Sequence, residues 1–232
     1  YPVIGDKAVA DVTGPDIETI LRPIWMAKPE TARRVLQRLT EIFDAAIFHR
    51  WRNTANPCTG VRQVLAKKRP EAKNHRAMPY ADVPAFIAKL REFPSWPETR
   101  LALEWLILTA SRSGETRGAR WDEIDEKKVV WTIPAARMKR RKPHAVPPSP
   151  RCLEILKEAK ALKRRSVLIF PSHEGGILSD MTFTKMLRDQ RYGEVATAHG
   201  FRSSFRDWCA EVAKVDEDVA EAALAHVVRD KV

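Results

Sequence analysis

One polar segment, residues 66–79, constrains the fold more than any other feature of the sequence. It reads AKKRPEAKNHRAMP and holds five Lys or Arg residues together with His75. Because it offers so few apolar side chains, the segment cannot bury itself in a hydrophobic core. We therefore predict two domains, at residues 1–65 and 79–232, joined by a basic linker over residues 66–78. The charge of this linker indicates that it follows a phosphate backbone.

The first predicted domain is entirely helical. A helical pattern runs from Asp16 to about Leu21, where Pro23 is expected to interrupt it, and a second helix has Pro29 in its first turn. The predicted apolar stripe of this second helix comprises Val35, Leu39, Ile42, Phe43, Ala46 and Ile47. Its opposite face carries Arg33, Arg34, Arg38 and Arg50. These arginines are either solvated or in contact with phosphate, and the pattern leaves both interpretations open.

The second predicted domain is mainly α-helical with a small antiparallel β-sheet, an α+β fold. Residues 129–133 are β-branched and aromatic, residues 145–147 form a second extended piece, and the polar run between them suits a hairpin loop. Residues 166–172 read as a short strand or extended segment. Six helices are predicted. Three have clear ranges, 79–93, 97–110 and 150–163, and Ser149 caps the third of these. The other three are known by their starts: one is capped by Ser179, one is opened by Thr197 or His199, and one starts at Asp216 and is unfinished at the end of the chain.

The charge balance points to a polyanionic partner. Forty-one Lys and Arg residues against 30 Asp and Glu residues give a formal net charge of +11, which favours nucleic acid over a membrane surface. A solvated basic surface with no partner is the alternative. The three cysteines form no CxxC pair, and no apolar run approaches the roughly twenty residues that a membrane helix needs. We therefore expect a soluble cytoplasmic protein with reduced thiols.

Basic residues lie at two helix ends where they can hold an anion. In TAHGFRSSFRDWCAEV, His199 and Arg202 fall on the first turn of one predicted helix, beside its unpaired N–H groups. In LTASRSGETRGARW, Arg112 follows a buried helix and precedes a new helix that contains Glu115. Arg112 either pairs with Glu115 as a structural residue or grips two oxygens of one phosphate.

Two further motifs complete the candidate set. RMKRRKPHAVP places Lys139 and Lys142 at a hairpin tip, where a cationic run is either solvated or delivers one lysine that protonates a leaving alkoxide. His226 follows EAALA, and a lone histidine there is often only structural. The sequence has no Walker loop, HExxH motif, paired Cys/His ligands or Gly-x-Ser-x-Gly elbow, and the acidic run WDEIDEKK fits a turn better than a metal site. We predict chemistry on phosphate with no metal and no cofactor.

In this order, the motifs TASRSGE, RMKRRKPHAVPPS, AHGFRSSFRDW and LAH resemble the catalytic domain of the tyrosine recombinases, most closely the integrases of bacteriophages and genomic islands. The resemblance covers nearly the whole chain. Residues 1–65 look like the helical core-binding domain of the family, which clamps DNA, and residues 79–232 look like its catalytic domain. The start of the chain resembles the junction that follows an N-terminal arm-binding domain.

The resemblance implies a role for each candidate residue. Arg112 and Arg202 correspond to the two arginines that clamp the scissile phosphate. Lys139 corresponds to the general-acid lysine that protonates the departing 5′ oxygen, with Lys142 as the second choice. His199 and His226 correspond to histidines that bind the phosphate and assist proton transfer. A supporting carboxylate, Glu115, corresponds to the acidic residue that orients the first arginine.

The family nucleophile is a tyrosine roughly ten residues after the last histidine, and it forms a 3′-phosphotyrosine bond. The sequence ends six residues after His226, and its three tyrosines, Tyr1, Tyr80 and Tyr192, stand elsewhere. We therefore expect a fragment, lacking the nucleophile and the N-terminal arm-binding domain, that binds DNA as a monomer without cleaving it covalently.

For the full-length protein, the resemblance implies a site-specific DNA recombinase in the bacterial cytoplasm, associated with the nucleoid. Its implied partners are double-stranded DNA at attachment sites, three further copies in a homotetramer, and an accessory DNA-bending or directionality factor, with no membrane. Two alternatives stay open: a DNA-binding architectural protein without catalysis, and an enzyme like the type IB topoisomerases.

Overall fold

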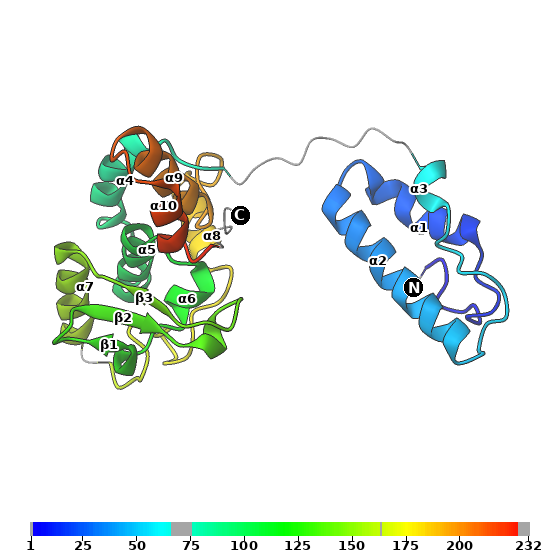
Figure 1. Ribbon diagram of the computed structural model, residues 1–232, viewed down its shortest axis with the longest axis horizontal. Helices are drawn as coiled ribbons and strands as arrows, with labels where there is room; N and C mark the ends of the chain where they lie inside the picture. The colour runs from blue at the N-terminus through cyan, green and yellow to red at the C-terminus, as the bar shows by residue number, and fades with distance from the viewer. Residues whose placement is uncertain (1, 66–75, 163, 227–232) are drawn as a thin grey trace. The chain divides into compact units, whose positions relative to one another are not determined.

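The computed structural model describes residues 2–65, 76–162 and 164–226 (Figure 1). The chain divides into two compact units, Tyr1–Lys73 and Asn74–Val232, and each has its own hydrophobic core. The greater part of the predicted linker, residues 66–75, lies outside the described residues. Its last three residues, 76–78, pack in the second unit, because Met78 is buried and the carbonyl of Arg76 accepts a hydrogen bond from the Thr197 N–H at 3.0 Å.

The first unit contains α1 (Gly14–Trp25), α2 (Pro29–Phe48) and α3 (Val61–Val64). Thr13 caps α1, and the Asp16 carboxylate accepts from the backbone N–H and the hydroxyl of Thr13. The prediction that Pro23 interrupts this helix is wrong: the proline lies inside α1, which continues to Trp25. Burial of Leu21 and Trp25 on the core face offsets the free-energy cost of the hydrogen bond that the proline cannot make.

The buried face of α2 differs from the predicted stripe. Phe43 and Ala46 are buried as expected, whereas Ile42 is 57% exposed and Ile47 is 37% exposed. Ala32 and Leu36 are buried in the first half of the helix instead. The helix presents more apolar side chains than the small core of this unit can cover, so the sequence pattern alone did not fix which face is turned inward.

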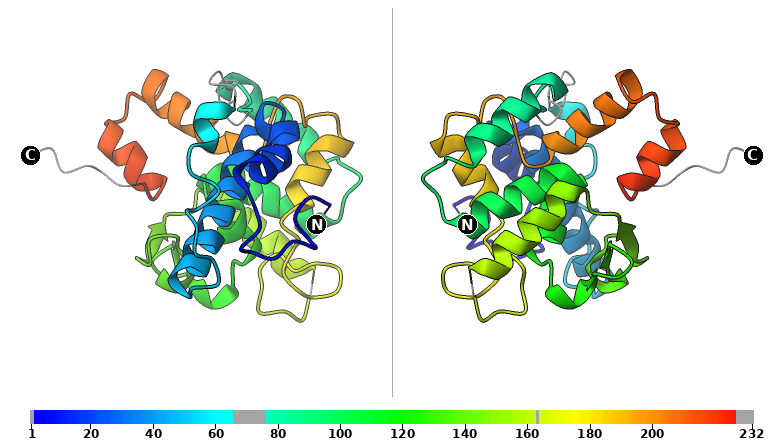
Figure 2. Two further views of the ribbon diagram at one scale, coloured as in Figure 1. Left: turned by 90° about the vertical axis from the view of Figure 1, so that its right-hand side faces the viewer. Right: turned by 90° about the vertical axis from the view of Figure 1, so that its left-hand side faces the viewer.

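The second unit is built around α5 (Pro97–Thr109), whose Trp105, Leu103 and Leu106 are fully buried. The predicted helix at 79–93 is a short 3-10 turn at Tyr80–Asp82 followed by α4 (Val83–Leu90). Along one side of α5 packs α7 (Pro150–Ala161), as Figures 1 and 2 show. The other helices are α6 (Ser113–Arg117), α8 (Thr182–Asp189), α9 (Gly200–Glu211) and α10 (Glu217–Ala223).

The predicted hairpin is confirmed. Strands β2 (Val130–Ile133) and β3 (His144–Val146) pair antiparallel, with Ile133 opposite His144 and Trp131 opposite Val146. A third strand, β1 (Ile124–Asp125), pairs with β2 and was missed because two residues carry no readable alternation. Pro171 and Ile177 form an isolated bridge in the segment that was expected to be extended.

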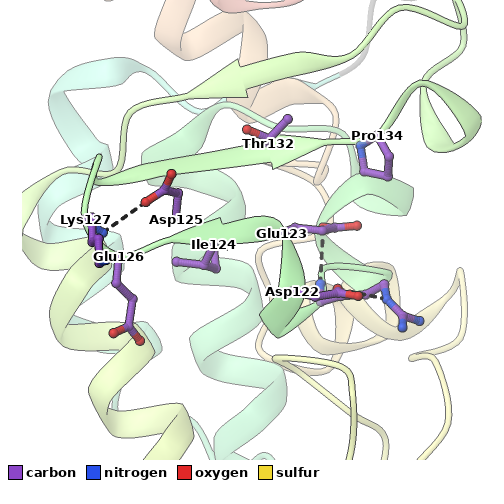
Figure 3. A pocket seen from close by; sticks show the side chains of 9 residues that line it. Asp122, Glu123, Ile124, Asp125, Glu126, Lys127, Thr132 and Pro134 are labelled. Atoms are coloured by element: carbon purple, nitrogen blue, oxygen red, sulfur yellow. Dashed lines mark hydrogen bonds and ion pairs between the residues drawn. The ribbon is translucent and has the colours of Figure 1, made fainter.

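The acidic run before β2 forms a turn, as predicted. The Asp125 carboxylate accepts from the backbone N–H groups of Lys127 and Lys128 at 3.1 and 2.9 Å. Figure 3 shows side chains that line a surface cavity at this run, among them Glu123, Asp125 and Lys127. Glu123 is buried and accepts hydrogen bonds from Trp131 Nε1 and from Arg137. Among the residues that the structure describes, no cluster of His, Cys, Asp or Glu has the geometry to hold a metal ion.

One of the two predicted helix caps is confirmed, since Ser149 Oγ accepts from the Cys152 N–H at the start of α7. The other is wrong, because α8 begins at Thr182 and the Ser179 hydroxyl accepts instead from the N–H of Met181, in the turn before the helix. The predicted start of the last helix at Asp216 is also confirmed, because the Asp216 carboxylate accepts from the Asp218 N–H at the N-cap of α10.

The last helix is shorter than predicted. Instead of continuing through His226, α10 ends at Ala223, and Ala225 has a left-handed backbone with a φ of 50°. The sequence has no glycine here to mark the end of a helix. The described parts of the chain contain no helix long and apolar enough to cross a membrane.

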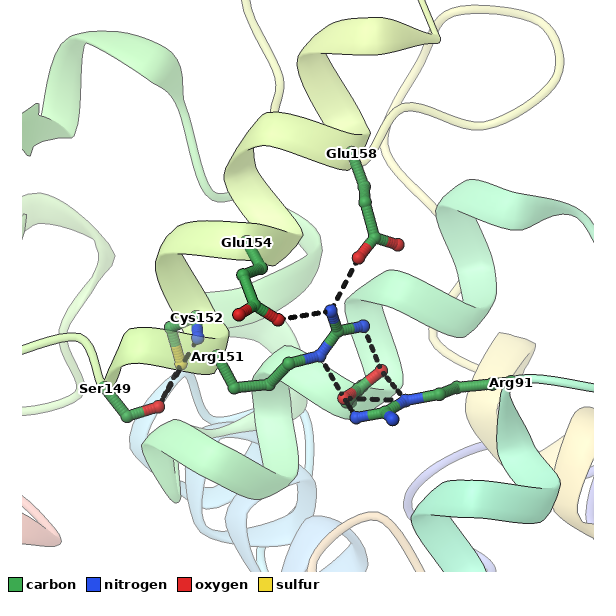
Figure 4. A network of polar contacts seen from close by, with 7 residues as sticks. Arg91, Ser149, Arg151, Cys152, Glu154 and Glu158 are labelled. Carbon is green, nitrogen blue, oxygen red and sulfur yellow. Dashed lines mark hydrogen bonds and ion pairs between the residues drawn. The ribbon is translucent and has the colours of Figure 1, made fainter.

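A buried carboxylate ties α5 to its neighbours. Glu104 is 1% exposed and accepts hydrogen bonds from Arg91 and from Arg151, which also pairs with Glu154 and Glu158 on the surface of α7 (Figure 4). Burial raises the pKa of Glu104, but the hydrogen bonds from Arg151 and Arg91 outweigh that effect and hold the pKa below its usual value. The carboxylate is therefore ionised in the folded protein.

Candidate active site

The end of α5 fixes the first arginine. The helix terminates at Ala110, which has a left-handed backbone with a φ of 47°. The next residue, Ser111, is buried and joins a chain of hydroxyl hydrogen bonds from Thr109 to Thr116, with oxygen-to-oxygen distances of 2.9 and 2.6 Å. This buried chain ties the end of α5 to α6 and leaves Arg112 at the N-cap position of α6.

Glu115 orients Arg112 through both of its carboxylate oxygens. One oxygen accepts from the Arg112 backbone N–H at 2.7 Å, and the other accepts from Arg112 Nη1 at 2.8 Å. Glu115 itself is only 4% exposed. The pairing of these two residues follows from their spacing of three on one helical turn. The other guanidinium nitrogen of Arg112, Nη2, donates to the carbonyl oxygens of Leu224 and Ala225 at 3.5 and 3.4 Å.

The second arginine, Arg202, is 4% exposed on the first turn of α9. Its guanidinium donates to the Ala110 carbonyl, to the Leu224 carbonyl at 2.6 Å, and to Nε2 of His226 at 3.1 Å. Burial, with a smaller contribution from the nearby Arg112 charge, lowers the pKa of Arg202 to about 10. The Nε–H of this guanidinium is buried without a hydrogen-bond partner among the described residues.

These contacts give the site its chemical character. The two guanidinium groups lie close enough for the charge of Arg112 to lower the pKa of Arg202. The Glu115 carboxylate accepts a hydrogen bond from Arg112. A buried cation with an unpaired donor is costly unless an anion completes it. Planar guanidinium groups match the oxygens of a phosphate better than any other side chain. Two neighbouring guanidinium groups therefore give this site residue types that can bind the oxygens of a phosphate.

His226 joins the arginine cluster from the segment after α10. Its Nε2 lies 3.1 Å from Arg202 Nη2, and its Nδ1 lies 2.7 Å from a carboxylate oxygen of Glu221. The structure thus brings together Arg112, Glu115, Arg202 and His226 from three separate parts of the second unit. Glu221 was missed in the sequence, because residues five apart on a continuous helix do not share a face, and the two side chains meet only because α10 ends at Ala223.

His199 occupies the N-cap position of α9, and its carbonyl accepts from the Arg202 backbone N–H at 3.1 Å. The Thr197 hydroxyl accepts from the Gly200 N–H at 2.9 Å, so both predicted helix-opening residues contribute to this end. Gly200 is required for the packing, because a Cβ atom there would lie 2.0 Å from the Arg76 carbonyl oxygen. His199 itself is exposed at this end of α9.

The hairpin lysines lie apart from this cluster. Lys139 and Lys142 are both exposed in the β2–β3 loop, and Arg141 between them has a left-handed backbone with a φ of 52°. Within the described residues, neither lysine forms an ion pair.

The charges of the site act on His144, which the sequence offered only as a landmark in the hairpin motif. It is half-buried on β3. Burial lowers the pKa of His144; a hydrogen bond to the backbone of Ala223 opposes this shift, as does the charge of Glu115. The charges of Arg112 and Arg202 also lower the pKa of His144.

Two family models match this chain. The phage integrase central domain matches residues 1–64, and the phage integrase family matches residues 76–230. The chain belongs to the phage integrase family. This result confirms the family that the four sequence motifs indicated.

Integrases with similar sequences come from prophages. The prophage integrase IntZ of Escherichia coli (strain K12) is 34% identical over 229 residues, which cover 98% of this chain and 56% of that protein. The prophage integrase IntA of the same strain is 32% identical over 239 residues, again covering 56% of its length. The chain thus spans a little over half the length of these relatives.

The fold is also that of solved integrases. A lambda integrase dimer bound to a COC′ core site matches with a TM-score of 0.74 at 21% identity, over 99% of this chain and 65% of that chain. A lambda integrase tetramer bound to a Holliday junction matches with a TM-score of 0.70 at 20% identity, over 96% of this chain and 66% of that chain. The predicted fold class, mainly α with a small antiparallel sheet, is confirmed.

The two described tyrosines of this integrase are engaged away from the arginine cluster. The Tyr80 hydroxyl donates to the Glu211 carboxylate at 2.9 Å, and this bond is the main reason that the pKa of Tyr80 is raised. Tyr192 packs its ring against Phe86 and Phe93. Both side chains therefore have structural roles.

Proposed function

We propose that this chain supplies the DNA-binding surface and the phosphate-activating residues of a site-specific DNA recombinase. The observation that carries the proposal is the pair of neighbouring guanidinium groups, Arg112 and Arg202, with Glu115 bonded to the first and His226 to the second. Family membership gives the reaction class: cutting and rejoining of DNA strands through a 3′-phosphotyrosine intermediate.

In the proposed reaction, Arg112 and Arg202 bind the non-bridging oxygens of the scissile phosphate, and Glu115 holds Arg112 in place. A tyrosine hydroxyl loses its proton, a transfer that His199 assists, as its oxygen attacks phosphorus and the bond from phosphorus to the 5′ oxygen breaks. Lys139, or Lys142 in its place, gives the proton that the departing 5′ oxygen takes up. His199 and His226 donate hydrogen bonds to the phosphate. Attack by a 5′ hydroxyl on the phosphotyrosine reverses the sequence and rejoins the strand.

Side chains supply the positive charge that neutralises the reacting phosphate, so we propose a reaction that needs neither a metal ion nor a cofactor. Two arginines and a lysine provide the cationic environment that a divalent ion provides in other phosphoryl-transfer enzymes. The nucleophile is a tyrosine other than Tyr80 and Tyr192, because both of those rings are engaged elsewhere.

We assign DNA binding to both units. Residues 1–65 form the core-binding domain, residues 66–78 the basic connection, and residues 79–232 the catalytic domain. Arg33 and Arg34 on α2 pair with Glu30 in the DNA-free chain, whereas Arg38 is exposed on the same helix. We expect these arginines to contact the phosphate backbone, which gives affinity but no sequence information.

Recombination requires several copies of the protein on DNA. We propose a homotetramer for the full-length protein, because a solved neighbour is a lambda integrase tetramer on a Holliday junction. An accessory DNA-bending or directionality factor is proposed as a further partner. We place the reaction at the bacterial nucleoid, because the matched relatives are prophage integrases of E. coli.

The test uses nicked duplexes that carry the attachment site and trap a covalent intermediate. The full-length protein is expected to form a protein–DNA adduct on a denaturing gel in the presence of EDTA, and the 232-residue chain is expected to bind the same duplex with strong salt dependence. Binding without an adduct would favour a non-catalytic architectural protein. Relaxation of supercoiled plasmid without site preference would favour an enzyme like the type IB topoisomerases.

A further inference from the structure

Glu221 contacts the site without facing the phosphate position. This α10 residue accepts from the ring of His226 at 2.7 Å through one carboxylate oxygen. Its other oxygen pairs with Arg206 Nε at 3.0 Å, and Arg206 also pairs with Glu217 at 3.2 Å. The Glu221 side chain is 18% exposed, whereas that of Glu217 is 77% exposed. Of the two acidic side chains, only Glu221 is held between α9 and the imidazole.

The two contacts of His226 define its tautomer. Arg202 is always protonated and can only donate, so Nε2 of His226, 3.1 Å from Arg202 Nη2, must be the acceptor of that hydrogen bond. The proton of the neutral ring therefore sits on Nδ1, where the Glu221 carboxylate accepts it. In water a free imidazole prefers the opposite tautomer, so the protein has to impose this one.

The imidazole is not held by packing alone. The His226 side chain is 40% exposed and follows a left-handed residue, Ala225, at the end of α10. Its ring needs a second anchor if Nε2 is to stay turned toward Arg202. Glu221 supplies that anchor from the preceding turns of the same segment, and Arg206 fixes the carboxylate in turn.

We propose that Glu221 is a positioning residue for the strand-cleavage step. It holds the ring of His226 in the Nδ1–H form with Nε2 directed at the phosphate position. When a phosphate takes the place of His226 as the partner of Arg202, Nε2 takes a proton from solvent and donates it in a hydrogen bond to a phosphate oxygen. The carboxylate then faces an imidazolium and stabilises its charge. The binding of phosphate and the protonation of His226 rest on the proposed function, whereas the Nδ1–H form of His226 in the DNA-free chain does not.

The first experiment measures the tautomer in the DNA-free chain. Nitrogen-15 NMR of the histidine rings distinguishes a protonated Nδ1 from a protonated Nε2. We expect His226 in the Nδ1–H form in the wild-type chain and in Glu221→Gln, whose amide oxygen still accepts. Glu221→Met removes the acceptor and is expected to give a ring with the solvent mixture of tautomers.

Glu217→Met is the matched control, because it removes the neighbouring carboxylate from the same arginine without touching the imidazole. We expect it to keep the Nδ1–H form. If Glu221→Met keeps that form as well, Arg202 alone fixes the ring and the proposal is wrong. If Glu217→Met loses it equally, the effect comes from the packing of α10 and the proposal is again wrong.

The second experiment tests the consequence for cleavage in the full-length protein. Glu221→Met is expected to reduce the rate of adduct formation by about 10-fold to 100-fold, the range found when a group that orients a functional histidine is removed. Duplex affinity is expected to stay within about 2-fold of wild type, because the arginines remain. An unchanged rate would overturn the positioning role. A wild-type protein that forms no adduct would overturn the proposed function and leave the tautomer result standing.

Discussion

Replacing Arg202 by methionine separates the structural and functional roles of this buried arginine. A pKa of about 10 means that the folded protein disfavours the charged form of Arg202 by about 3 kcal/mol relative to water. Methionine removes that cost. It also leaves the carbonyls of Ala110 and Leu224 without their donor, at about 1 to 3 kcal/mol each. The two effects oppose each other, so we expect a net loss of no more than about 3 kcal/mol.

For a unit of this size, about 3 kcal/mol corresponds to a fall in melting temperature of at most roughly 12 °C. The effect on function is expected to be much larger. Without one of two phosphate-clamping arginines, the full-length protein should form the covalent adduct at least about 1,000-fold more slowly. Duplex binding should weaken modestly, and the slope of log affinity against log salt should shrink by about 0.9.

Thermal unfolding of the 232-residue chain, salt-dependent duplex binding and adduct formation together check this prediction. Arg188→Met is the control, because it removes one positive charge from an exposed position on α8. A stability loss above about 5 kcal/mol for Arg202→Met would show that the arginine is mainly structural. An adduct rate equal to that of Arg188→Met would refute its role at the phosphate.

Three further predictions follow from other parts of the second unit. Glu104→Gln should lower the free energy of unfolding by about 3 kcal/mol in urea titrations, since it leaves two arginines without their shared anion, whereas Glu154→Gln on the surface should change it by less than about 0.5 kcal/mol. Burial lowers the pKa of His144 in the folded state, so the unfolded chain takes up a proton at a higher pH than the folded chain does. The free energy of unfolding should therefore fall as the pH drops through the ordinary histidine range. His144→Gln should reduce that loss between pH 7.5 and 5.5, and an unchanged pH dependence would contradict the lowered pKa of His144. Lys139→Ala in the full-length protein should slow cleavage by about 100-fold or more. A DNA substrate with sulfur in place of the 5′ oxygen should restore the rate, because a thiolate leaving group needs no proton. If the sulfur substrate restores the rate of Lys142→Ala and not that of Lys139→Ala, Lys142 is the general acid.

Local signals predicted most of the elements correctly. Pro29 and Pro97 stand in the first turns of their helices, Ser149 and Asp216 cap theirs, and all four helices begin where the sequence placed them. Such signals act within a few residues, so they can be read without knowing the fold. The errors arose where packing decided: burial of Trp25 carried α1 past Pro23.

The candidate site shows the same division. The pairing of Arg112 with Glu115 was readable, because two residues three apart on a helix start lie side by side in any fold. The burial of Arg202 and its bond to the Leu224 carbonyl were not readable, since they join residues 22 apart in the sequence. His144 and Glu221 were missed for the same reason, as their importance comes from the groups that α10 and β3 bring to them.

By itself, the sequence determined the family, the order of the motifs and the residue types of the candidate site. These follow from composition and short-range spacing, which the chain carries in any conformation. Only the tertiary structure decided that Arg202 is buried near Arg112 with a donor unpaired, and that His226 contacts both Arg202 and Glu221. Charge burial, pKa and tautomer depend on which groups from distant segments meet in a low-dielectric interior, and no local pattern encodes that.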